Sequence, residues 1–242
     1  MLKKEEIIQF HRDGMIFREG KLAGKIPFVV RTFRMSDNLN FAKAMDELDV
    51  ADSDAHINNI VAQKTLEGCL VSVNGMKVTP DVFKNYTAEK CNYIIGFAKT
   101  LFNDLAEYLE GFSEQKLTDT ELEEFILTDK IERTETLEYD EDVEPLVFQY
   151  RILPVGEITK ITASLREELK KRISRMHASA LTDRAFAAAT IMSINGIEVN
   201  QQTIDEFNVE LVSFIMSRAA SVEKQLRECL QNPSKLGESL KN

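Results

Sequence analysis

Three histidines are the first residues to consider for chemistry, because an imidazole can bind a metal or transfer a proton near neutral pH. His56 and His177 lie 121 residues apart, the offset that also relates two longer stretches of the chain, whereas His11 has no such counterpart. The neighbours of the pair do not match, since Asp54 corresponds to Arg175, so the two positions do not offer the same set of metal ligands. We expect no metal and no cofactor, and an enzyme using His56 or His177 stays open as an alternative for metal analysis to test.

The cysteines and the known catalytic motifs also argue against an enzyme. Cys69, Cys91 and Cys229 form an odd set without close spacing, which favours core packing over a disulfide framework, a zinc site or redox chemistry. The sequence contains no G-x-S-x-G nucleophile elbow, P-loop, dinucleotide fingerprint or H-E-x-x-H helix. We therefore predict no catalytic residues.

The acidic residues are concentrated in one segment. From Asp119 to Glu144, twelve carboxylates stand against Lys130 and Arg133, a local balance equal to the net charge of the whole chain, −10. We interpret this segment as a solvated linker helix and hairpin between two halves, with an acidic docking arm for a basic partner as the alternative.

A basic run at Lys170–Arg175 raises the question of nucleic-acid binding. Lysine and arginine neutralise phosphates, but Glu167 and Glu168 precede the run and no aromatic side chain interleaves it. A mixed-charge helix face is the favoured interpretation. Charge reversal of Lys170 and Lys171 with Arg172 would test the alternative of a nucleic-acid-associated protein.

Length and composition are those of a globular protein. The chain has 242 residues, of which 43% are hydrophobic and 29% are charged. A chain of this length buries about 70–75% of its unfolded surface on folding. No apolar run reaches the roughly 18–20 residues that cross a bilayer, and Met1–Glu6 leads into a charged segment without a signal-peptide core. We expect no membrane contact and a protein that stays in the compartment where it is made.

The strongest pattern in the chain is an internal repeat. The string LVSVNGMKVT at Leu70–Thr79 returns as IMSINGIEVN at Ile191–Asn200, 121 residues later. A repeat at half the chain length indicates a duplicated module. We predict a first module at 1–116, an acidic junction with a hairpin strand at 117–143, and a second module at 144–242.

An Asn-Gly pair lies at the centre of each copy. Both residue types tolerate positive φ, so Asn74-Gly75 and Asn195-Gly196 suit a type I′ turn between two short strands, or a left-handed end of the preceding helix. A backbone nest for an anion is disfavoured, because no glycine-rich stretch surrounds either pair. We predict a structural role for these four residues.

The order of elements is the same in both halves, and it predicts an α+β, mainly helical fold. Each half reads as a β-hairpin, then helices, the Asn-Gly turn and a long helix. Hairpins are predicted within 15–33 and 134–153, and shorter helices at 37–48, 53–70, 157–176 and 182–191. Thr79-Pro80-Asp81 combines an N-cap, a first-turn proline and an acidic residue, which predicts the start of the long helix of the first half.

The long helix of each half carries an apolar stripe with a period close to 3.6 residues. Its members in the first half are Phe83, Tyr86, Ile94, Phe97, Leu101, Leu105 and Leu109. Their partners at the repeat offset are Ile204, Phe207, Ile215, Arg218, Val222, Leu226 and Leu230, of which only Arg218 is polar. We expect this stripe to serve the core and a subunit contact, with Phe97, Leu101, Leu105, Val222 and Leu226 as candidate interaction residues.

The second half resembles proteins encoded in the tail modules of tailed bacteriophages. Glu144–Glu157 (EPLVFQYRILPVGE) is a strand that ends in a Pro-x-Gly-Glu helix start, and Ala188–Gly196 (AATIMSING) carries the turn. This order is similar to baseplate hub assembly proteins of T-even-like phages and to tail assembly chaperones. The first half has Met35-Ser36-Asp37 at the helix start, so that part of the resemblance applies to one half only.

The resemblance implies a non-enzymatic structural or assembly protein that contacts other phage tail or baseplate hub proteins. It implies a location in the host cytoplasm during assembly, or in the virion tail, and it leaves a homo-oligomer open. It carries over no catalytic residues. A chaperone that is not retained in the virion and a nucleic-acid-associated phage protein are the alternatives.

Overall fold

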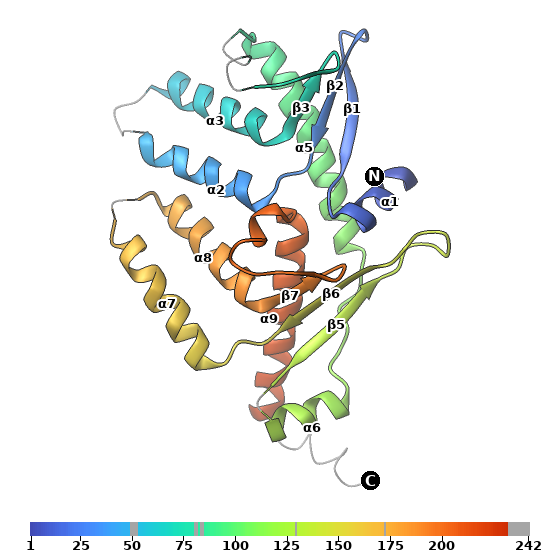
Figure 1. The fold of residues 1–242 in the computed structure, drawn as a ribbon, viewed down its shortest axis with the longest axis vertical. Coiled ribbons are helices and arrows are strands. Elements are labelled where there is room, and N and C mark those ends of the chain that lie inside the picture. Colours follow the sequence, from blue (N-terminus) through green and yellow to red (C-terminus); the bar gives the residue numbers. More distant parts are fainter. Residues whose placement is uncertain (49–52, 80–81, 83–84, 129, 172, 232–242) are drawn as a thin grey trace.

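Each half of the chain forms a four-stranded antiparallel sheet with helices packed against it, an α+β, mainly helical fold of two similar modules (Figure 1). The computed structural model describes residues 1–48, 53–79, 82, 85–128, 130–171 and 173–231. The first module contains α1 (Lys4–Asp13), β1 (Phe17–Leu22), β2 (Ile26–Arg31), α2 (Met35–Ala44), the 3₁₀ turn η1 (Met45–Glu47), α3 (Asp54–Cys69), β3 (Leu70–Val73), β4 (Met76–Lys77) and α5 (Ala88–Glu110). The second module contains α6 (Asp119–Thr128), β5 (Glu132–Leu137), β6 (Leu146–Arg151), α7 (Val155–Leu169), α8 (Arg175–Thr190), β7 (Ile191–Ile194), β8 (Ile197–Glu198), the 3₁₀ turn η2 (Ile204–Glu206) and α9 (Val209–Gln231).

The two sheets repeat each other in strand order and register. The orders are β1-β2-β3-β4 and β5-β6-β7-β8, and Phe28 pairs with Val73 as Phe148 pairs with Ile194. A register shift follows Val29 in β2 and recurs at the equivalent place in β6. The sequence repeat therefore reports a structural repeat.

The Asn-Gly pairs form the tight turns between β3 and β4 and between β7 and β8. Asn74 and Gly75 have φ of 52° and 75°, and Asn195 and Gly196 have φ of 48° and 75°. Positive φ at both central residues defines the type I′ turn. The alternative of a left-handed helix end does not apply, because α3 and α8 pass directly into extended backbone at the first residue of the next strand.

The second module begins at α6, so the segment predicted as a junction is its first part. α1 and α6 are each ten residues long, and each is followed after the same interval by the first strand of its sheet. The same ion pair links helix and strand in both modules: Arg18 Nε lies 2.6 Å from Glu6 Oε1, and Arg133 Nε lies 2.8 Å from Glu121 Oε1. The modules differ in the hairpin loop, which spans 23–25 in the first and 138–145 in the second.

Two helix boundaries in the second module differ from prediction. The helix predicted to reach residue 176 ends at Leu169, and the helix predicted to begin at Thr182 begins at Arg175. The physical reason is an N-cap, because Ser174 Oγ accepts the backbone N–H of His177 and fixes a helix start there. Ser53 caps α3 through the N–H of His56 in the same way.

The long helix of the first module begins later than the Thr79-Pro80-Asp81 signal predicted. α5 starts at Ala88, where Thr87 Oγ1 accepts the N–H of Lys90. Pro80, Asp81 and the stripe residue Phe83 lie outside the described residues. In the second module α9 likewise starts only after the separate turn η2. In the first module the cap at Thr87 therefore marks the start of the long helix.

The two modules pack together head to tail. α2 of the first module lies against α8 of the second, α5 lies against α9, and buried side chains of both modules form one core. A β-bridge joins Arg34 to Asn208, and the N–H of Met35 donates to the Phe207 carbonyl at 2.9 Å. As a result, α3, α2, α8 and α7 form a row along one side of the molecule (Figure 1). No helix among the described residues is long and apolar enough to cross a membrane.

Candidate interaction surface

Four of the five candidate interaction residues lie in the interior. Leu101 and Leu105 on α5 are 0% exposed, and Val222 and Leu226 on α9 are 1% and 3% exposed. Phe97 is partly buried and packs edge to face on Phe28, with ring centroids 5.1 Å apart. The four buried side chains belong to the shared core of the two modules, so in this structure they present almost no surface to another molecule.

Arg218, the one polar member of the stripe, has a matched partner inside the second module. Its Nε lies 3.8 Å from Glu135 Oε2, and its Nη2 donates to the Phe112 carbonyl at 2.5 Å. Glu135 is 3% exposed and also accepts a hydrogen bond of 2.6 Å from the Tyr150 hydroxyl. Burial, together with that bond, raises the pKa of Tyr150, so the phenol stays protonated and donates.

The first module fills the same place with an apolar contact. Gly20 stands where Glu135 stands in the second module, and Phe97 stands where Arg218 stands. A Cβ on Gly20 would lie 2.4 Å from the Phe28 ring, so the aromatic cluster requires a glycine there. The duplicated fold therefore carries an apolar pair in one copy and an ion pair in the other, and this difference explains the polar exception in the stripe.

The histidines lie in separate places. His177 on α8 bonds through Nδ1 to the Asp46 carboxylate, whereas His56 is exposed in the first turn of α3. His11 is buried: its Nδ1 donates to the Glu144 carbonyl at 2.9 Å, and its Nε2 lies 2.6 Å from the Tyr108 hydroxyl. Within the described residues no group of three His, Cys, Asp or Glu side chains could hold a metal ion.

The cysteine placement agrees with core packing. Cys69 is buried at the end of α3, and burial raises the pKa of its thiol to about 12. A thiol with that pKa is protonated at neutral pH and is a poor nucleophile. Cys91 and Cys229 are partly buried on different helices.

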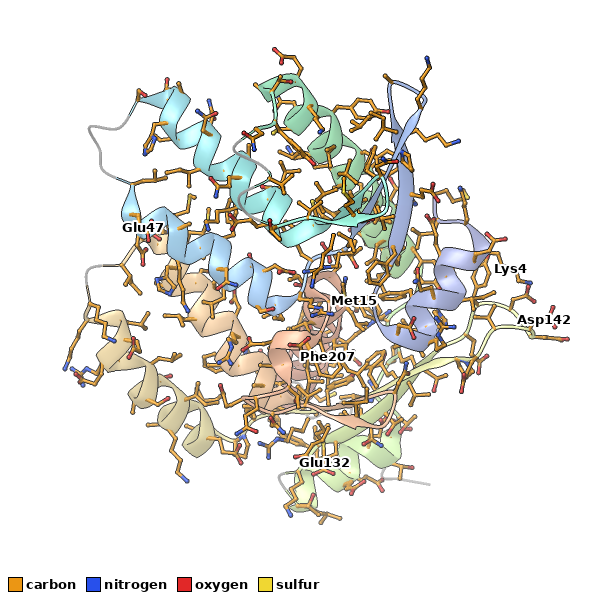
Figure 2. The ribbon with its side chains drawn as sticks, turned by 45° about the horizontal axis from the view of Figure 1, so that its top comes forward. Lys4, Met15, Glu47, Glu132, Asp142 and Phe207 are labelled. Atoms are coloured by element: carbon orange, nitrogen blue, oxygen red, sulfur yellow. The ribbon has the colours of Figure 1, made fainter. Side chains whose placement is uncertain are left out.

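Part of the acidic segment contacts the first module while it stays exposed to solvent. Lys4 Nζ on α1 lies 2.8 Å from Asp140 Oδ2 and 3.7 Å from Asp142 Oδ2 in the β5–β6 loop (Figure 2).

The lysines of the basic run form ion pairs with glutamates at the end of the same helix. Lys170 Nζ lies 2.6 Å from a Glu167 carboxylate oxygen, and Lys171 pairs with Glu168 in the same way. These exposed i,i+3 pairs fit a mixed-charge helix face; Arg172 lies outside the described residues.

The outer face of α7 is open to solvent. No residue of α7 is buried, and the helix packs mainly against α8. Val155 is 78% exposed, and a shallow depression of about 630 Å³ runs along the face past Ile158, Thr162 and Leu169. Its counterpart α2 instead buries Met35 and Ala42, which are 4% and 0% exposed.

The sequence patterns did not single out this face. The signal that could have done so is the comparison of equivalent positions, since Met35 and Ala42 correspond to Val155 and Thr162 at an offset of 120 in this part of the chain. No protein-family model, no curated protein and no solved structure matches the chain. The functional argument therefore rests on the geometry of the two modules and on their open surfaces.

Proposed function

We propose that the protein is a non-enzymatic assembly or structural component of a bacteriophage tail or baseplate hub, and that it acts through protein–protein contacts. The observation that carries this proposal is the outer face of α7, which exposes Val155, Ile158 and Leu169 on a helix without one buried residue. Neighbouring exposed apolar side chains on one face are typical of a surface that another protein covers. The phage assignment itself rests on the resemblance of the second half.

The chemistry-bearing residues support a structural role. His177 and Asp46 join α8 to the end of α2, and His11 joins α1 to the β5–β6 loop and to α5. The ion pairs Glu6–Arg18 and Glu121–Arg133 recur as links between helix and strand. Each of these groups is engaged in holding elements together.

Capture from infected cells tests the proposal. The tagged protein is crosslinked in the host during phage production, purified, and its partners are identified by mass spectrometry. We expect tail, baseplate or hub proteins with the wild type, and their loss with Ile158→Asp on α7. Ile8→Asp on α1 is the matched control, because Ile8 and Ile158 are 39% and 37% exposed.

Capture of no tail or hub protein by the wild type would overturn the proposal. Equal capture by Ile158→Asp and by the control would remove α7 as the surface responsible. Mass spectrometry of finished particles separates two versions of the role, since a structural subunit is present in them and a tail assembly chaperone is absent.

A further inference from the structure

The contact between the two modules is of the kind that can repeat. It joins α2 of the first module to α8 of the second, and α8 is the counterpart of α3 and not of α2. At the α2–α8 contact the two sides of the interface are therefore different surfaces, whereas α5 and its counterpart α9 contact each other. An interface of this head-to-tail type leaves one unused copy of each surface at the ends of the array. These are α7, the counterpart of α2, and α3, the counterpart of α8, at opposite ends of the helix row (Figure 1).

The internal interface has an apolar part and a polar part. Met35 and Ala42 on α2 are buried, and Ala180 on α8 is 5% exposed. At the far end of α2, where Glu47 lies next to the start of α8 (Figure 2), the Asp46 carboxylate accepts the N–H of Ser174 at 2.7 Å and bonds to His177. A carboxylate there stabilises the positive first turn of α8.

The same positions are open on α7. Val155 stands in the place of Met35, Thr162 in that of Ala42, and Arg166 in that of Asp46. All three are exposed, and Val155 is 78% exposed where Met35 is 4% exposed. Two of them, Thr162 and Arg166, line the depression of about 630 Å³.

The matching surface is open on α3. Asn59 occupies the place of Ala180 and is exposed, beside a groove of about 470 Å³ between α3 and the start of α5. In the second module the equivalent region, formed by α8 and η2, is where α2 lies. The first turn of α3 keeps Ser53 and His56 at the positions of Ser174 and His177.

The charges at the two open surfaces are complementary. Asp46 in η1, directly after α2, corresponds to Arg166 on α7, and Arg175 at the start of α8 corresponds to Asp54 at the start of α3. The sign of the charge is reversed on both sides at once. Inside the chain, the acidic Asp46 lies at the start of α8, which carries the basic Arg175. Between two copies, the basic Arg166 would lie at the start of α3, which carries the acidic Asp54.

We propose that copies of this chain associate head to tail, with the outer face of α7 of one copy packing against α3 and the adjoining groove of the next copy, as α2 packs against α8 within the chain. The partner that covers the α7 face is then a second copy of the same protein, and the tail or hub proteins of the proposed function bind the associated copies, so that Ile158→Asp weakens both contacts. Repetition of the contact gives a ring if the rotation closes and a filament if it does not. This self-association does not depend on the phage assignment. Because one helix of each copy supplies most of the contact, we expect concentration-dependent association instead of a permanent dimer.

Sedimentation velocity over a range of protein concentrations tests the proposal with charge variants. We expect the sedimentation coefficient of the wild type to rise with concentration, and Arg166→Asp or Asp54→Arg to weaken association at least about tenfold, because like charges then face each other. The double variant Asp54→Arg/Arg166→Asp should associate like the wild type, and so should an equimolar mixture of the two single variants. Lys160→Asp is the matched control, since it makes the same charge change on the far side of α7, where the counterpart Asn40 stays exposed.

Three results would overturn the proposal. They are a wild type that remains monomeric at every concentration, association that neither single variant weakens more than Lys160→Asp does, and a double variant that does not recover association. All substituted residues are exposed, so folding should be unchanged, and circular dichroism checks this. If the sedimentation experiments show no self-association but the capture experiment still finds tail proteins, the proposed function stands.

Discussion

Glu210, the second residue of α9, makes the stability of the protein depend on pH in an unusual direction. Its Oε2 atom is enclosed and has no hydrogen-bond partner within the described structure. Burial raises the pKa of this carboxyl from the ordinary value of 4.5 to about 7. Between these values the folded protein holds a proton that the unfolded chain releases, so the free energy of unfolding falls as pH rises.

The magnitude follows from the two pKa values. One pH unit of difference corresponds to about 1.4 kcal/mol. For Glu210 the free energy of unfolding contributed by the proton is full below pH 4.5 and is lost as pH rises through about 7, a change of about 3 kcal/mol. Glu210→Gln removes the charge, so we expect the variant to match the wild type near pH 4.5 and to exceed its stability by up to about 3 kcal/mol at pH 8.

Urea unfolding at pH 4.5, 6 and 8 measures this difference, followed by far-UV circular dichroism. The matched control is Glu89→Gln, because Glu89 holds the same helix position in α5 but is exposed, and hydrogen bonds to its backbone N–H and to Thr87 lower its pKa. We expect no pH-dependent gain from the control. A Glu210→Gln variant no more stable than wild type at pH 8 would refute the account of this buried carboxyl.

Three further predictions concern stability. Leu105→Ala should lower the free energy of unfolding in urea by about 2–5 kcal/mol, because Leu105 is 0% exposed. Leu127→Ala, at an 83% exposed position, should change it by less than about 0.5 kcal/mol. Equal effects would contradict the placement of the stripe in the core. Arg218→Ala should cost about 1–3 kcal/mol, because Glu135 then keeps only Arg133, 3.7 Å away, as a charged partner among the described residues. Arg218→Phe/Glu135→Gly, which copies the first module, should recover part of that loss, and a double variant as unstable as Arg218→Ala would count against the equivalence. Burial lowers the pKa of His11, so the stability that the neutral side chain contributes is lost as pH falls below the ordinary value of 6.5. In His11→Gln the free energy of unfolding should therefore depend less on pH below 6.5. The same pH dependence in the variant and the wild type would exclude this role.

The repeat made much of the fold predictable, because local signals set it. The Asn-Gly pairs require positive φ, and the alternating apolar runs require hairpins, so the strands and turns follow from residue types. The boundary between α7 and α8 was missed although its signal was present. Ser174 holds the offset position of Ser53, which caps α3, but the charged run before it continues a helical pattern and hides the break.

The functional surface could not be predicted in the same way, because it depends on which faces meet in space. An apolar stripe on a helix looks the same whether its own chain or a partner covers it, and Leu101 and Val222 proved to be covered by their own chain. The open face of α7 differs from α2 chiefly in having no helix beside it. Only the head-to-tail packing of the modules, a tertiary fact, shows that Val155 stands where Met35 is buried.

Site-specific crosslinking tests most directly the claim that the two ends of the helix row bind each other. A photo-crosslinking amino acid replaces Ile158 on α7, and ¹⁴N- and ¹⁵N-labelled chains are mixed before irradiation. α7 and α3 lie at opposite ends of the row within one chain (Figure 1), so a crosslink between them must join two copies. The account predicts mixed-label crosslinks between α7 and the α3 segment at 53–64. Irradiated protein without mixed-label crosslinks, or with crosslinks only to other segments, would contradict it.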